Sequence, residues 1–126
     1  MIIGIGIDFV EVERIARLLL RYPDRASVRL FTDRELSHCR STHSPAESYA
    51  ARFAAKEAVF KALGTGWSCG VTWHDAEVIA ESSGAPCLLL HGEAGRLAGS
   101  RGVRRAHLSL THTRTLAGAY VVLEGR

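Results

Sequence analysis

The chain has 126 residues, of which 47% are hydrophobic and 23% are charged, and its formal net charge is +3. These values are typical of a globular protein with a buried core, and they exclude a disordered or fibrous chain. No apolar stretch approaches the ~18 residues of a membrane span. The apolar start "MIIGIGID" lacks the basic region and the cleavage site of a signal peptide. We therefore expect one cytoplasmic domain over residues 1–126, without membrane contact.

The cysteines indicate neither a disulfide framework nor a zinc site. Their number is odd, no two of them form a CxxC pair, and they stand at Cys39, Cys69 and Cys87. Paired or metal-binding cysteines show characteristic even counts and short spacings. We expect all three thiols to be reduced and to serve as small packing residues.

The first half of the chain predicts one strand followed by helices. Residues 2–8 alternate between isoleucines on one face and Gly4, Gly6 and Asp8 on the other, so a strand should end at Asp8 with a bare face. Residues 10–22 have the apolar spacing of a helix. Two capping boxes follow, "TDRE" at 32–35 before a short helix and "SPAE" at 44–47 before a helix of about 19 residues.

The second half predicts mainly strands. Gly64 is a natural C-terminal cap for the long helix, and "GTGWSCG" then reads as a glycine-rich loop. The pattern favours one hairpin formed by residues 75–81 and 86–91 and a second formed by residues 105–113 and 116–124. A short helix is expected between them, at 93–100. The whole predicts an α+β fold in which a small, mostly antiparallel sheet packs with one long and several short helices.

Asp8 and Glu57 are the candidate site residues. Glu57 lies among small and aromatic residues on the long helix, with Lys61 one turn ahead. Mg²⁺ is usually held by one or two carboxylates together with phosphates, and a lysine can neutralise a phosphate. Taken singly, each feature has an ordinary alternative. Asp8 can cap a helix, Glu57 and Lys61 can form a surface pair, and the glycines can form a turn.

Two long motifs, taken together, resemble one family. "GIGIDFVEVERI" at 4–15 and "RFAAKEAVFKALGTG" at 52–66 are similar to the holo-acyl-carrier-protein synthases, the short members of the 4′-phosphopantetheinyl transferase family. "SGAPCL" and "HLSLTHT" resemble its glycine-x-proline turn and its histidine–serine strand, so the likeness covers essentially the whole chain. "WSCG" at 67–70 departs from the aliphatic and basic residues that are more common there.

The resemblance implies an activity and a set of site residues. The family transfers the phosphopantetheine arm of coenzyme A to a serine of an apo acyl carrier protein and releases adenosine 3′,5′-bisphosphate. It implies that Asp8 and Glu57 bind Mg²⁺, with Mn²⁺ as an alternative, and that Lys61 contacts a phosphate; these three are the expected catalytic residues. The expected coenzyme A-binding residues are Arg52, Lys61, Gly64, Gly66, Pro86 and His107. It also implies a homotrimer with active sites at subunit interfaces and a role in fatty-acid biosynthesis.

The carrier protein also needs a docking surface. Arg14, Arg17 and Arg21 recur on one face of the first predicted helix, and carriers of this kind are acidic around the modified serine. The alternative is a solvated helix face. The general base stays open between a water on the metal and the metal-binding glutamate, and His112 is predicted to be a structural or surface residue.

Two other functions compete with this interpretation. A nucleic-acid-binding module would use the arginines, but aromatic residues are few and no recognised binding motif is present, and Asp8 and Glu57 would have no role. We therefore expect no nucleic-acid partner. The second alternative keeps the family and exchanges the fatty-acid carrier for a carrier domain of a polyketide or peptide synthase.

Overall fold

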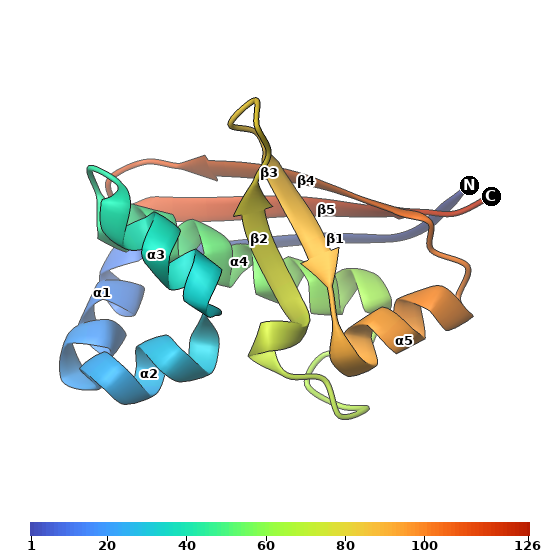
Figure 1. The fold of residues 1–126 in the computed structure, drawn as a ribbon, viewed down its shortest axis with the longest axis horizontal. Helices are drawn as coiled ribbons and strands as arrows, with labels where there is room; N and C mark the ends of the chain where they lie inside the picture. The colour runs from blue at the N-terminus through green and yellow to red at the C-terminus, as the bar shows by residue number, and fades with distance from the viewer.

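The computed structural model describes residues 1–126 and confirms the α+β class. Figure 1 shows the long helix α4 lying against a three-stranded sheet, with α1 to α3 gathered at one end and α5 at the other. The elements are, in chain order, β1 (Ile2–Glu11), α1 (Val12–Arg21), α2 (Pro23–Leu30), α3 (Asp33–Ser41), α4 (Pro45–Leu63), η1 (Trp73–Asp75), β2 (Ala76–Ala80), β3 (Pro86–Leu90), α5 (Gly92–Ser100), β4 (Arg105–His112) and β5 (Leu116–Glu124). No helix is long and apolar enough to cross a membrane.

The strands form two sheets where the sequence suggested one. β1, β5 and β4 form an antiparallel sheet with β5 in the centre, while β2 and β3 pair only with each other. The hairpin β2–β3 crosses in front of α4 in Figure 1, with its tip projecting past the sheet. Both expected hairpins are therefore confirmed, but they belong to different sheets.

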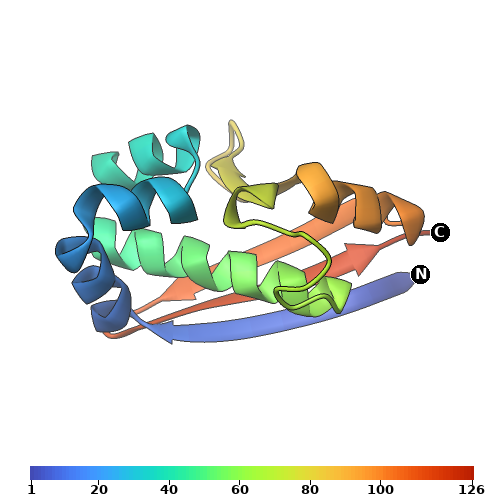
Figure 2. The ribbon, with the colours of Figure 1, turned by 90° about the horizontal axis from the view of Figure 1, so that it is seen from below.

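Helix α4 is the centre of the core, as Figure 2 shows from below. It is rich in alanine, begins with Pro45 at its first turn, and ends at Gly64, whose φ of 73° is left-handed. Glycine adopts this conformation without steric cost, so the helix stops where the sequence predicted. Ala54, Ala55 and Ala58 are fully buried, which lets neighbouring elements approach the helix closely.

The bare face of β1 is the face that packs on α4. A Cβ atom added at Gly4 would lie 2.0 Å from the carbonyl oxygen of Ala62, and one at Gly6 would lie 1.8 Å from that of Ala58. Only glycine permits this backbone contact. The space left by the glycines is therefore filled by the helix itself, and the isoleucines of β1 point to the other side of the sheet.

Three local differences from the sequence-based expectation concern the first half. β1 continues past Asp8 to Glu11 because its residues pair with β5 as far as Glu11 opposite Leu116. Asp8 therefore lies within the strand, and Glu11 is the N-cap of α1, so the capping alternative for Asp8 is wrong. Pro23 begins the additional helix α2 instead of merely following α1.

The two predicted capping boxes had different outcomes. At α3 the backbone N–H of Glu35 donates to Thr32 Oγ1 (3.3 Å), and the Glu35 carboxylate accepts from the backbone N–H of Thr32 (2.9 Å). At α4 the Ser44 side chain makes no capping bond. The helix still begins at Pro45, because proline at the first position has no N–H that needs a partner.

Candidate active site

Asp8 and Lys61 meet between β1 and α4. Lys61 Nζ donates to Asp8 Oδ1 at 2.8 Å and to the carbonyl oxygen of Ile7 at 3.1 Å. The Asp8 side chain is 17% exposed and that of Lys61 is 54% exposed, so the pair lies at an open edge of the core. The partner of Lys61 is thus Asp8 from a distant part of the sequence, and the surface pair with Glu57, the ordinary alternative, is not formed.

Glu57 belongs to the same cluster. Partial burial raises the pKa of its carboxyl group above the usual 4.5, the nearby charge of Asp8 raises it further, and Lys61 and Arg14 partly offset this. A raised carboxyl pKa beside another carboxylate means that two negative charges share a small, partly dehydrated space.

The donor set of this cluster suits a hard divalent cation. Asp8 and Glu57 supply carboxylate oxygens, the ligands that Mg²⁺ prefers, and Mg²⁺ sites often use only one or two protein carboxylates beside waters and substrate phosphates. Burial is the main reason why the pKa of Glu57 is raised, and the repulsion by Asp8 that adds to it is what such an ion would relieve. The two carboxylates therefore fit a Mg²⁺ ion that takes its remaining ligands from outside the chain.

A glycine loop stands directly after the helix that carries Glu57 and Lys61. Gly64 and Gly66 have φ angles of 73° and 54°, and both are exposed. A Cβ at Gly66 would meet nothing within 4 Å, so the space above this residue is open to a ligand. The backbone at Gly66 can consequently be approached closely by a large group such as a phosphate.

Arg52 and Pro86 lie in a separate hollow. Arg52 is only 6% exposed, and its Nε atom is buried without a hydrogen-bond partner. The hollow has a volume of about 430 Å³ and lies between the start of α4, the tip of hairpin β2–β3 and the end of β4. Because Arg52 and Glu57 are five residues apart, they point about 140° apart around α4. The hollow and the Asp8 cluster therefore face different sides of the helix.

His107 lies apart from both places. It is exposed on β4, on the face of the sheet that points away from α4, and its Nε2 atom is 3.0 Å from Glu124 Oε1. Within one copy of the chain His107 thus joins neither Asp8 nor Arg52. Of the expected coenzyme-binding residues, Lys61, Gly64 and Gly66 are grouped at the end of α4, Arg52 and Pro86 share the hollow, and His107 stands alone.

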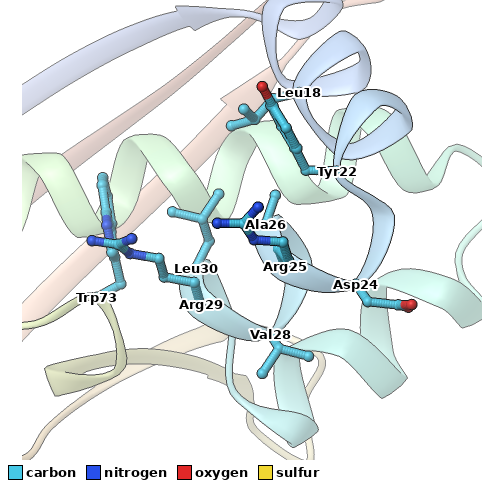
Figure 3. Close-up of a pocket in the computed structure, with 9 residues that line it drawn as sticks. All are labelled: Leu18, Tyr22, Asp24, Arg25, Ala26, Val28, Arg29, Leu30 and Trp73. Atoms are coloured by element: carbon cyan, nitrogen blue, oxygen red, sulfur yellow. The ribbon is translucent and has the colours of Figure 1, made fainter.

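The three arginines of α1 are exposed and lie beside a groove. Arg14 lies over the ring of Phe53 at 5.7 Å, Arg21 lies over Tyr22 at 5.4 Å, and Arg17 is 3.5 Å from Glu13. The groove has a volume of about 800 Å³, and Figure 3 shows its lining residues, which are Leu18, Tyr22, Asp24, Arg25, Ala26, Val28, Arg29, Leu30 and Trp73. A mostly apolar groove beside a row of cations suits an amphipathic, acidic surface.

Sequence reasoning missed most of this groove because it missed α2. The segment after Pro23 has Ala26 and Leu30 at helical spacing and buried, which is a usable signal. His43 and His112 also line the hollow around Arg52, and His112 is exposed. Their exposure and isolation in the sequence left no pattern that could have singled them out.

Comparison with known proteins shows the family. The model of the 4′-phosphopantetheinyl transferase superfamily matches residues 4–118, so the chain belongs to this superfamily. The holo-[acyl-carrier-protein] synthase of Koribacter versatilis (strain Ellin345) is 52% identical over 124 residues, which cover 98% of this chain and 99% of that protein. Within the superfamily, the chain is thus a member of the holo-[acyl-carrier-protein] synthases, as its motifs suggested.

Solved structures agree with this placement. The holo-[acyl-carrier-protein] synthase from Neisseria meningitidis has a TM-score of 0.89 and 32% identity, covering 98% of this chain and 99% of that one. The holo-(acyl-carrier-protein) synthase from Bacillus anthracis str. Ames, solved in complex with CoA (3′,5′-ADP), has a TM-score of 0.80 and 35% identity, covering 100% and 99%. The whole fold is therefore shared with enzymes of this family.

Proposed function

We propose that the chain transfers the 4′-phosphopantetheine arm of coenzyme A to a serine of an apo acyl carrier protein. The observation that carries this proposal is the cluster of Asp8, Glu57 and Lys61 beside the open glycine loop. It combines two carboxylates that can bind a metal ion with a cation that can bind a phosphate, and phosphoryl transfer needs both kinds of group. Support also comes from the relatives, which are holo-[acyl-carrier-protein] synthases, one of them in complex with CoA (3′,5′-ADP).

In the proposed reaction, the serine oxygen attacks the β-phosphorus of coenzyme A. A new phosphorus–oxygen bond forms, the bond to the bridging oxygen breaks, and adenosine 3′,5′-bisphosphate departs with the electron pair. Asp8 and Glu57 would hold Mg²⁺, which neutralises charge on the pyrophosphate when bound. Lys61 is half exposed and holds a positive charge where the phosphate oxygens would come to lie.

The serine proton needs an acceptor. Burial and the charge of Asp8 raise the pKa of the Glu57 carboxyl group. A raised pKa makes a carboxylate a better proton acceptor near neutral pH. A metal ion held by Glu57 would lower this pKa again, so the acceptor stays open between Glu57 and a water on the metal.

We further propose that the protein works as a homotrimer. The outer face of the sheet exposes Ile5, Ile7 and Phe9 of β1 together with Tyr120 of β5, whereas its β4 side carries His107. Exposed apolar patches of this kind mark interaction surfaces. A face with one apolar and one polar side is suited to head-to-tail contacts, which form a ring such as a trimer when the rotation between copies closes.

The trimer would explain why the coenzyme residues are divided. Arg52 and His107 are separated from Asp8 in one copy, and a site at a subunit interface could combine groups from two copies. Light scattering should give three times the chain mass of 13.7 kDa. Changing Ile7 to Lys should dissociate the particle and reduce transfer. A fully active wild-type monomer would contradict the assembly.

For the carrier protein, we propose docking at Arg14, Arg17 and Arg21. Their charge suits the acidic surface expected of a carrier, and the groove beside them offers apolar contacts. Charge complementarity of this kind accelerates association and selects partners. The pathway that we propose is fatty-acid biosynthesis, and polyketide biosynthesis is the alternative. The location in the cytoplasm stays a prediction.

Mass spectrometry of the carrier tests the reaction directly. An apo acyl carrier protein incubated with this protein, coenzyme A and Mg²⁺ should gain the mass of one phosphopantetheine arm. Removing Mg²⁺ with a chelator, or replacing the acceptor serine by alanine, should prevent the gain. Comparing carriers from fatty-acid, polyketide and peptide synthases would identify the partner. No mass gain on any of them would contradict the proposed function.

A further inference from the structure

The only two tryptophans of the chain pack against each other over α4, with their ring planes tilted by 50°. The ring centroids of Trp67 and Trp73 are 3.9 Å apart. Trp67 also packs on Phe60 with centroids 4.7 Å apart, and Trp73 stacks on Phe53 at 5.0 Å with an interplanar angle of 28°. The four rings form a continuous row, which we call the aromatic row.

The aromatic row lies beside the candidate active site. Phe53 precedes Glu57 by four residues and Phe60 follows it by three, so the two rings and the carboxylate share one side of α4. Trp67 directly follows Gly66, the open glycine after the helix. The aromatic row therefore joins the helix that carries the polar cluster to the loop that continues from it.

The loop at 64–70 has little to hold it in place by itself. Its φ angles are positive at Gly64, Gly66, Cys69 and Gly70, and at Cys69 the value of 66° is costly because the residue has a side chain. Few bonds form within the loop. The backbone N–H of Ser68 donates to the Thr65 carbonyl at 3.1 Å, and the Ser68 hydroxyl donates to the same oxygen at 2.6 Å. Contacts outside the loop must supply the remaining order.

Contacts with α4 supply part of it. The backbone N–H groups of Gly64 and Thr65 donate to the carbonyl oxygens of Lys61 and Phe60, both at 3.1 Å, and hold the start of the loop. Trp67 is held by the aromatic row, in which Trp73 is fixed by a hydrogen bond from Lys56 Nζ to its carbonyl oxygen at 3.0 Å. Lys56 is fully buried and also holds Glu35 and the Ala76 carbonyl, so Trp73 is firmly placed. Trp67 is 46% exposed and depends on Trp73 and Phe60 for its position. Within the aromatic row, Trp73 is thus the anchor and Trp67 the connection to the glycine loop.

We propose that Trp67 is a positioning residue that holds the loop at 64–70 in the conformation that receives the phosphates of coenzyme A. The proposal rests on the proposed function, since it assigns the loop to that substrate. Aromatic pairs contribute free energy beyond their buried area, and a ring that leans on two others restricts the chain next to it.

Steady-state kinetics of Trp67→Ala, Trp67→Leu and Trp67→Phe test the role. Without the ring the loop occupies its binding conformation for a smaller fraction of the time, and the apparent affinity falls by that fraction. We expect the KM for coenzyme A to rise about tenfold in Trp67→Ala, with kcat and the KM for the carrier changing less than about twofold. Trp67→Leu keeps an apolar contact without ring stacking and should be intermediate, and Trp67→Phe should restore the wild-type KM.

A matched control and a second measurement separate positioning from stability. Glu81→Gln, at an exposed position on the β2–β3 hairpin, changes neither the loop nor a ring and should leave both KM values as in the wild type. Because both tryptophans belong to the aromatic row, tryptophan fluorescence reports on it alone, and titration with coenzyme A should change the emission of the folded wild type. If Trp67→Ala does not fold, the comparison of Trp67→Leu with Trp67→Phe carries the test.

The outcomes distinguish this proposal from the proposed function. If the wild type adds the arm to the carrier, but Trp67→Ala and Trp67→Leu keep the wild-type KM for coenzyme A, Trp67 is only a packing residue and the proposal is overturned. An unchanged tryptophan emission at saturating coenzyme A would also overturn it. If the wild type modifies no carrier at all, the proposed function itself fails.

Discussion

Lys56 and Lys61 are the only lysines of the chain, and they stand five residues apart on the same helix. Both pair with a carboxylate that is distant in the sequence, Lys56 with Glu35 at 2.7 Å and Lys61 with Asp8 at 2.8 Å. The lengths are nearly equal, but the surroundings differ. Both partners of the first pair are 0% exposed, whereas the Lys61 side chain is 54% exposed.

The difference decides what each pair can do. Burial lowers the pKa of Lys56, and the charge of Glu35 and a hydrogen bond to it oppose this effect. Lys56 uses its three protons on Glu35 and the carbonyl oxygens of Trp73 and Ala76, and no donor remains for a ligand. Lys61 is reachable from solvent and can exchange Asp8 for a phosphate. Nearly equal bond lengths thus accompany a structural role for Lys56 and, as we propose, a chemical role for Lys61.

The largest expected effect is on stability, at the buried pair. Changing Lys56 to Met leaves Glu35 buried without its cation and should lower the free energy of unfolding by about 3–5 kcal/mol. Urea unfolding followed by circular dichroism measures this. Lys61→Met is the matched control and should change stability by less than about 1 kcal/mol. If Lys56→Met were as stable as the wild type, the buried pair would make no measurable contribution to the free energy of unfolding.

The next largest effect is on transfer, at the carboxylates. Asp8→Asn and Glu57→Gln keep the side-chain shape but remove the charge that would bind the metal, so transfer should fall by at least about a hundredfold. Circular dichroism should show an unchanged fold, because both residues lie at the open edge of the core. Glu81→Gln, an exposed site on the β2–β3 hairpin, is the control. Near-wild-type transfer by either folded variant would refute the metal assignment.

Lys61 itself should affect one substrate only. Lys61→Ala should raise the KM for coenzyme A by about tenfold, corresponding to ~1.4 kcal/mol, because a phosphate loses its cation. The KM for the carrier should stay within about twofold, and Lys61→Arg should restore part of the loss since it keeps the charge. Equal losses for both substrates would mean that Lys61 shapes the fold, as Lys56 does.

The arginines of α1 can be compared with the two lysines, because they are exposed and pair with no buried carboxylate. Changing Arg14 and Arg21 to Glu should raise the KM for the carrier by about tenfold, because like charges would then face each other. The KM for coenzyme A should barely move, and added salt should weaken the wild type toward the variant. Arg104 and Arg126 changed to Glu provide a charge-matched control. If the Arg14 and Arg21 variant keeps its carrier affinity, these arginines form a solvated face.

The smallest effect is the pH dependence of stability at Glu57. Its folded pKa lies above the usual 4.5, so the folded protein holds this proton more tightly than the unfolded chain. That contribution to stability is complete below pH 4.5 and is lost as the pH rises through the folded value. Without Mg²⁺, Glu57→Gln should therefore unfold at a higher temperature than the wild type at pH 7, and the gap should narrow below pH 4.5. A gap that does not depend on pH would contradict the assignment.

Local signals were enough to determine much of the secondary structure. Thr32 and Glu35 form the capping box that their spacing predicted, and Gly64 ends α4 because its left-handed conformation suits glycine. Both hairpins and the helix α5 also follow from alternation and turn residues. These features depend on residues within a few positions of each other, which is why a single sequence determines them. The family motifs are likewise contiguous stretches of chain, so the amino-acid order alone makes them recognisable.

Only the tertiary structure decided where the residues of the site meet. The partner of Lys61 is Asp8, because Gly4 and Gly6 let β1 pack directly on the backbone of α4. The division between the Asp8 cluster and the hollow of Arg52 follows from the direction of each side chain around α4. The contact between Asp8 and Lys61 joins positions that are 53 residues apart. Its geometry depends on how β1 packs on α4, and no local sequence pattern determines that packing.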